Sequence, residues 1–136
     1  MGKERAGFGR CRFHQLNKET VHPVISLMEK MRLGKHAVDV EPGSKLFAAY
    51  GERHISERHR HRHCLSNSYR EEMIKSGLII GAISPDKDLV ECVEWPDHPW
   101  GLGVQFHPEF KSKPTAVCPL FRDFIMAARD KKAAGN

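Results

Sequence analysis

The chain has 136 residues and a mass of 15.5 kDa, which is enough for one domain and too short for two. With 40% hydrophobic and 29% charged residues it is too apolar for a disordered tail, and no charge-free stretch approaches the roughly 20 residues that span a bilayer. The net charge of +5 permits nucleotides or acidic partners without demanding them.

The cysteines and the amino-terminal segment indicate the compartment. Four cysteines, Cys11, Cys64, Cys92 and Cys118, lie far apart and form no CxxC pair, which favours free thiols over a disulfide scaffold. The first twelve residues carry no apolar signal region. We therefore expect a cytoplasmic protein without a membrane or lipid anchor.

The first predicted elements are a strand and a short helix. An apolar run over residues 24–28 follows His22-Pro23 and predicts a short strand. After the breaker cluster at residues 41–44, Ser44 is expected to cap a helix over residues 45–50 that Gly51 ends.

The next segment, residues 57–64, alternates arginine and histidine. In an extended conformation such a strand has two chemically different faces. Arginines 58, 60 and 62 lie on one face, and histidines 59, 61 and 63 lie on the other.

The second half of the chain predicts a helix, three strands and a final helix. Asn67 is a plausible N-cap of a helix that runs to Ser76, with Gly77 just beyond its end. Strands over residues 78–83 and 89–95 flank turn residues and suggest a hairpin, and residues 101–106 predict a buried strand. After a loop, Pro119 begins a helix whose apolar stripe is Leu120, Phe121, Phe124, Ile125 and Ala128.

The richest chemical motif stands where the strand over residues 101–106 ends. Pro108 stops the ladder after His107, and Glu109 lies two residues on, where its carboxylate can orient the imidazole. Such a pair is the base and orienter of a nucleophilic triad. By spacing alone, a structural His-Pro-Glu turn at a strand end is the commoner interpretation.

A family resemblance favours the catalytic interpretation of this motif over the structural one. Residues 104–110 are similar to the histidine and glutamate signature of class I glutamine amidotransferases. The segments Met31 to Gly34, Glu57 to Arg62, Leu89 to Glu91, His98 to Trp100 and Pro119 to Phe121 resemble, in order and spacing, the C-terminal part of the glutaminase domain of the CTP synthase family. The resemblance implies an α/β fold, a partial class I glutamine amidotransferase-like sheet with flanking helices.

The resemblance also implies roles for three residues. His107 resembles the general base of the Cys-His-Glu triad, Glu109 its orienting carboxylate, and Arg62 the arginine that holds the α-carboxylate of glutamine. The parent enzyme makes CTP from UTP with ammonia from glutamine. ATP and Mg²⁺ are implied for that parent only, and we expect no cofactor in this chain.

The sequence departs from the family at the nucleophile and the substrate site. It contains no Gly-x-Cys-x-Gly elbow, and Cys11 has neither a buried strand before it nor a glycine two residues after it. Gln15 falls where the family has a glutamate for the substrate ammonium, and the link between Met28 and Met31 is much shorter than in the family. The other three cysteines are expected to be small buried thiols.

Two further site chemistries have weaker support. A metal site from His59, His61 and His63 would lack ligands from a second element, so no metal is expected. We expect no nucleic acid binding, since no aromatic residues interleave with the arginines.

Two hypotheses remain for the chain as a whole. It is either a glutaminase piece, inactive alone, or a non-catalytic module that binds a synthase domain or its own copies. Residues 1–14 form an N-terminal segment of unclear order, and residues 15–136 form the partial amidotransferase domain. A sheet that lacks neighbouring strands would expose edges and apolar faces, so we expect a chain prone to association.

Overall fold

The computed structural model describes residues 24–135, which form five strands and three α-helices. Two short 3₁₀ turns, Asn67–Tyr69 and Pro108–Phe110, complete the elements. In chain order the strands and α-helices are β1 (Ile25–Val40), α1 (Lys45–Tyr50), β2 (His54–Leu65), α2 (Arg70–Lys75), β3 (Ile79–Ile83), β4 (Val90–Trp95), β5 (Gly101–Val104) and α3 (Pro119–Ala134).

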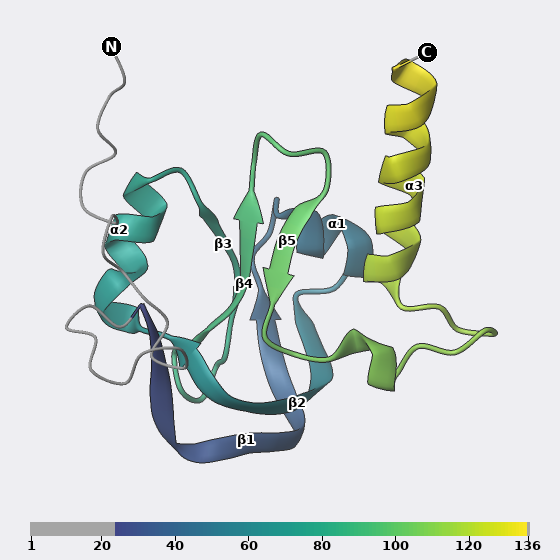
Figure 1. Ribbon diagram of the computed structural model, residues 1–136. Helices are drawn as coiled ribbons and strands as arrows, with labels where there is room; N and C mark the ends of the chain where they lie inside the picture. Colours follow the sequence, from purple (N-terminus) through teal and green to yellow (C-terminus); the bar gives the residue numbers. More distant parts are fainter. Residues whose placement is uncertain (1–23, 136) are drawn as a thin grey trace, which may run out of the picture.

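The strands form one antiparallel sheet in the order β2-β1-β3-β4-β5. The long β1–β2 ribbon curls beneath the shorter strands (Figure 1). The curl brings the edge strand β2 to the segment that follows the other edge strand, β5. There the backbone N–H of His107 donates to the carbonyl of Arg58 over 2.9 Å. This mixed arrangement of sheet and flanking helices confirms the expected α/β class.

β1 is about three times as long as the strand that we predicted over residues 24–28. The prediction ended it too early because the polar residues that follow lack a periodic apolar signal, whereas pairing with β2 supports the whole length. The register shifts once: Leu27 pairs with His63 and Arg32 with His61, so residues 28–31 bulge from the ribbon. The bulge coincides with the link between Met28 and Met31, which is shorter than in the family that the sequence resembles.

The helix at residues 45–50 is confirmed together with both of its caps. The hydroxyl of Ser44 accepts from the N–H of Phe47, and Gly51 adopts the left-handed conformation at φ 70°. A second cap was not foreseen: the buried carboxylate of Glu94, on β4, accepts the N–H groups of Lys45 and Leu46, each over 3.0 Å. Glu94 thus joins α1 to the sheet through charge-assisted hydrogen bonds.

Two predictions about the second half of the chain need correction. Asn67 does not cap a helix; it begins a 3₁₀ turn, and its side chain donates to the carbonyl of Asp88. The strand predicted over residues 101–106 ends at Val104 and is half-buried, because β5 is an edge strand. The hairpin of β3 and β4 is confirmed.

The core lies between the sheet, α1 and the start of α3, and is built mainly from Val38, Val40, Leu46, Ala82, Cys92, Phe106, Cys118 and Leu120. Cys64, Cys92 and Cys118 are free and buried, as predicted, while Cys11 and Gln15 lie outside the described residues. Among residues 24–135, no helix is long and apolar enough to cross a membrane.

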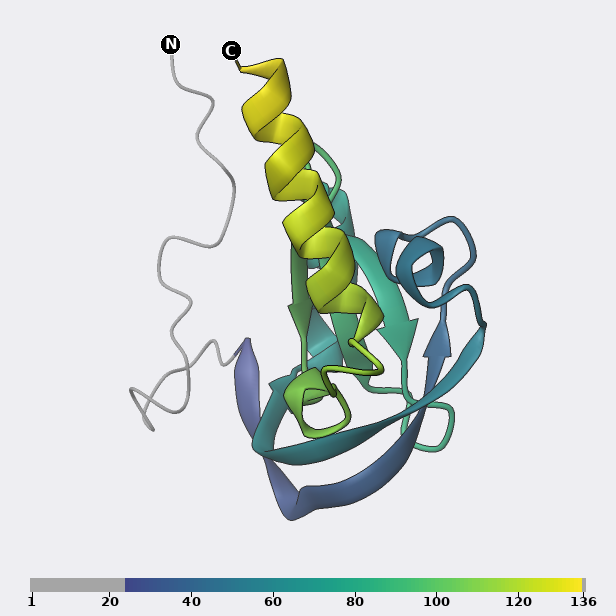
Figure 2. The same cartoon turned by 90° about the vertical axis from the view of Figure 1, so that its right-hand side faces the viewer.

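The predicted apolar stripe of α3 is largely unpacked. Only Leu120 of this helix is buried, whereas Phe124 is 52% and Ile125 is 64% exposed. The first turn meets α1, where Arg122 donates to the carbonyl of Ala49, and the rest rises away from it (Figure 2). An apolar face of this kind needs a further partner.

We expect the exposed face of α3 to cause self-association. Replacing Phe124 and Ile125 together by serine should shift the chain toward monomer in sedimentation velocity, because it removes two large exposed apolar side chains. The matched control replaces Arg129 and Lys132 by serine on the same helix and should leave the distribution unchanged. A monodisperse wild-type monomer with a cooperative thermal transition would contradict this expectation.

Candidate functional site

The ring of His107 is paired with the carboxylate of Glu109 at the end of β5. The Nδ1 atom of His107 lies 2.6 Å from Oε1 of Glu109 within the 3₁₀ turn that Pro108 begins. The ring also stacks on Phe110, with centroids 5.1 Å apart and planes at 27°. With Nδ1 engaged by the carboxylate, Nε2 is the ring nitrogen left to exchange a proton with a reacting group.

Local hydrogen bonds keep the Glu109 carboxyl ionised. Its own backbone N–H and then the His107 ring lower the pKa of Glu109 below its ordinary value. The two side chains are 38% and 52% exposed, so the pair is open to a partner or substrate. An ionised carboxylate fixes the tautomer of the imidazole and stabilises its protonated form.

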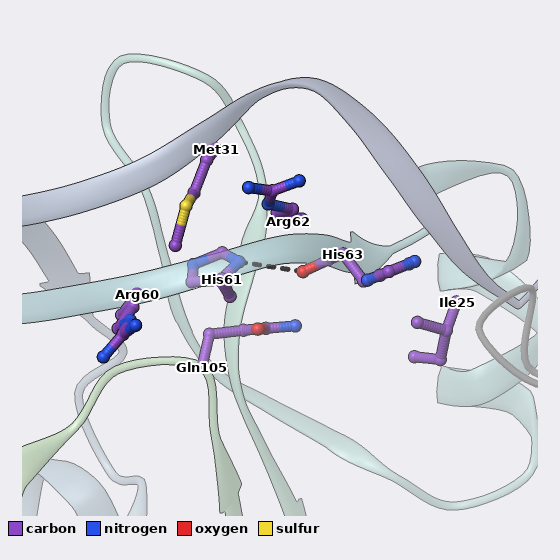
Figure 3. Close-up of a pocket in the computed structure, with 7 residues that line it drawn as sticks. All are labelled: Ile25, Met31, Arg60, His61, Arg62, His63 and Gln105. Atoms are coloured by element: carbon purple, nitrogen blue, oxygen red, sulfur yellow. Dashed lines mark hydrogen bonds between the residues drawn. The ribbon is translucent and has the colours of Figure 1, made fainter.

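A pocket of about 540 Å³ opens beside β2, between the ribbon and the segment that follows β5. Figure 3 shows Arg62 and His61 together with Gln105, which stands two residues before His107. The remaining lining residues are Ile25, Met31, Arg60 and His63. The pocket is lined by two arginines, whose positive charge favours an anionic group such as a carboxylate.

The structure places the three predicted site residues on two neighbouring segments. His107 and Glu109 are in direct contact, and Arg62 lines the neighbouring pocket. Within residues 24–135, no hydrogen bond or ion pair joins Arg62 to either member of the pair. The pair and the arginine are therefore separate parts of the site.

A buried polar network that the sequence did not reveal lies behind the pocket. Arg32 of β1 donates to the carboxylate of Glu91 on β4, and both side chains are almost fully buried. The ring of His59 completes the group, with Nδ1 at 3.8 Å from Oε2 of Glu91 and 3.0 Å from Nε2 of His61. The available signal was a carboxylate inside an apolar strand, Leu89-Val90-Glu91.

Burial decides the charges in this network. Desolvation raises the pKa of Glu91, although the hydrogen bond from Arg32 acts against it. Desolvation and the nearby Arg32 charge lower the pKa of His59 to about 3, and burial also lowers the pKa of His61. Both histidines are therefore neutral at pH 7, and because Nδ1 of His61 donates to the carbonyl of His63, Nε2 of His61 accepts a hydrogen bond from Nδ1 of His59.

A second buried carboxylate connects β2 to the turn that carries His107 and Glu109. Glu57 accepts from the hydroxyl of Tyr50 over 2.9 Å and lies 3.8 Å from the ammonium of Lys111. Lys111 caps the 3₁₀ turn and donates to the carbonyl of Ser56 over 2.5 Å. These contacts hold the segment that carries His107 and Glu109.

Comparison with known proteins accounts for this arrangement. The family model "Glutamine amidotransferase class-I" matches residues 6–127. The chain is 51% identical to the CTP synthase of Clostridium kluyveri and 47% identical to that of Moorella thermoacetica, over 87% and 89% of its own length. It spans about a quarter of the length of these relatives, 24% in both cases.

Two solved structures share the fold. The glutaminase domain of Trypanosoma brucei CTPS, with bound acivicin, superimposes with a TM-score of 0.85 and 33% identity. That match covers 91% of this chain and 52% of the other. A GMP synthase protein from Thermoplasma acidophilum matches with a TM-score of 0.62, 19% identity and 82% coverage of this chain, which shows the fold alone.

These matches show that the chain belongs to the class-I glutamine amidotransferase family. They also confirm the predicted resemblance to the glutaminase domain of CTP synthase.

Removing one partner of the Arg32–Glu91 pair should destabilise the fold more than removing both. Arg32→Leu leaves a buried carboxylate uncompensated and is expected to cost about 3–5 kcal/mol in urea unfolding. The double variant Arg32→Leu/Glu91→Leu should recover part of that loss. As a control, Arg129→Leu breaks the exposed ion pair with Asp130 and should cost less than about 1 kcal/mol. Additive losses would contradict a coupled pair.

Proposed function

We propose that this chain provides the base and substrate half of a glutaminase site and needs a cysteine elbow from another segment. The observation that carries the proposal is the His107–Glu109 pair, 2.6 Å apart at the end of β5, beside the pocket that Arg62 lines. The 136 residues contain no Gly-x-Cys-x-Gly sequence that would supply the nucleophile.

Each of the three residues has a separate role in this proposal. His107 is the general base and then the general acid, through Nε2, and Glu109 orients it through Nδ1. Arg62 holds the α-carboxylate of glutamine in the pocket with its planar guanidinium group. Gln15 replaces a family glutamate, so the ammonium of glutamine would be held more weakly.

The chemistry follows from these positions. His107 removes the proton of the cysteine thiol, whose sulfur bonds to the side-chain carbonyl carbon of glutamine. The carbon–nitrogen bond breaks, and ammonia leaves with the proton from the imidazolium. A water molecule then hydrolyses the thioester, with His107 again accepting a proton, and releases glutamate.

The unpacked surfaces are consistent with such a missing half. The chain covers 52% of the Trypanosoma brucei glutaminase domain, and the apolar face of α3 and the free edge of β5 remain without neighbours among the described residues. The partner that we propose is the rest of a glutaminase domain or a synthase domain. In this proposal ATP and Mg²⁺ act in the synthase part only, and glutamine hydrolysis takes place in the cytoplasm.

The chain alone should not release glutamate from glutamine, because the members of a triad act as a unit. Mixing it with the preceding half of the glutaminase domain of Clostridium kluyveri CTP synthase should produce activity. His107→Ala should abolish the restored activity, whereas His54→Ala, a substitution of an exposed histidine on β2, should not. Activity of the chain alone that Cys11→Ser removes would overturn the proposal and identify Cys11 as the nucleophile.

In the same reconstituted site, Arg62→Ala should raise the KM for glutamine far more than Arg58→Ala. A bidentate carboxylate contact is worth about 1.5–3 kcal/mol, which corresponds to roughly ten- to more than hundred-fold in binding. Arg58 is the matched control, since it is an exposed arginine of the same strand that does not line the pocket. Equal effects of the two substitutions would refute the assignment of Arg62.

A second candidate function rests on the exposed apolar face of α3. The chain would then be a binding module that associates with a synthase without hydrolysing glutamine. Stable binding of the supplied half in the mixing experiment, without glutamate release, would favour this alternative.

A further inference from the structure

We propose that His59, His61 and Glu91 form a binding site for a single divalent metal ion, best suited to Zn²⁺. The site lies behind the pocket and uses none of the residues assigned to glutamine hydrolysis. The sequence argued against a metal because the histidines lie on one strand; the fold supplies the missing ligand, since Glu91 comes from β4.

The three residues bring their ligand atoms close to one another. Nδ1 of His59 is hydrogen-bonded to Nε2 of His61 over 3.0 Å and lies 3.8 Å from Oε2 of Glu91, and each of the three residues offers a ligand atom within 4.8 Å of the others. Bonds of about 2.0–2.1 Å to a tetrahedral zinc ion separate neighbouring ligands by about 3.3–3.4 Å. The His59 pairs therefore need shifts of a few tenths of an ångström, whereas the ligand atoms of His61 and Glu91, which lie within 4.8 Å of each other, need to approach by up to about 1.4 Å.

Hydrogen bonds outside this shell orient two of the three ligands. Nδ1 of His61 donates to the carbonyl of His63 over 2.8 Å, so Nε2 of His61 carries a lone pair, which accepts from Nδ1 of His59. A metal ion would replace this hydrogen bond, and the proton of His59 would move from Nδ1 to Nε2 of its ring. Arg32 binds one oxygen of Glu91, and the other, Oε2, is buried and has no hydrogen-bond partner in the described part of the chain. Backbone carbonyls and charged side chains commonly support metal ligands in this way.

Charge and access define which ion would fit. Arg32 already neutralises Glu91, so a dication would add positive charge to a buried region, which costs free energy. An anionic fourth ligand, such as hydroxide, would reduce this cost, and the neutral histidines add no further positive charge. His61 lines the pocket, from which a water or hydroxide can reach the fourth position. Two imidazoles and one carboxylate favour Zn²⁺ over Mg²⁺, which prefers oxygen ligands.

The test is a competition titration of the full chain with Zn²⁺ and a chromophoric chelator. We expect one equivalent to bind, and His61→Gln to lower the affinity at least ten-fold. His36→Gln is the matched control: this ring lies 5.3 Å from the ring of His59 but outside the ligand set, so its loss should leave the affinity unchanged. Binding that is equal in wild type and His61→Gln would show that surface histidines bind the ion and would overturn the proposal.

A second measurement on the wild-type chain decides the matter even if a variant misfolds. In ¹⁵N spectra of labelled histidine side chains, Zn²⁺ should shift Nδ1 of His59 and Nε2 of His61 at one equivalent, and Mg²⁺ should not. No shift of either nitrogen at one equivalent of Zn²⁺ would refute the site. The result is independent of glutaminase activity, so its failure would leave the proposed function intact.

Discussion

The buried contact between Arg32 and Glu91 constrains the rest of this structure. It links β1 to β4 across the curl of the sheet, and it places His59 of β2 against the same carboxylate. Two charges without water are stable only when they face each other with good geometry, so the three strands have little freedom of relative position. The network thereby fixes the relative positions of the strands behind the pocket.

The curl of the sheet also determines where the His107–Glu109 pair lies. Because the β1–β2 ribbon wraps beneath the shorter strands, the carbonyl of Arg58 meets the N–H of His107. Lys111, held near Glu57, fixes the other end of the same turn. Among residues 24–135, β5 is an edge strand and most of α3 is exposed.

Local signals explain the elements that the sequence predicted well. Ser44 and Gly51 define α1 because a hydroxyl cap and a left-handed glycine act within a few residues. The alternation from Arg58 to His63 likewise imposes its faces on any extended strand. The length of β1 was missed because pairing with β2, rather than its own composition, keeps its polar residues extended.

The sequence by itself determined the family, the His107–Glu109 turn and the two faces of the Arg/His strand, since motifs and periodicity depend on neighbours along the chain. Tertiary structure alone decided that Glu91 lies beside His59 and His61, that Arg62 lines a pocket near the His107–Glu109 turn, and that α3 is largely unpacked. These facts depend on the path of the sheet. A curl that joins residues about thirty or more positions apart leaves no local pattern.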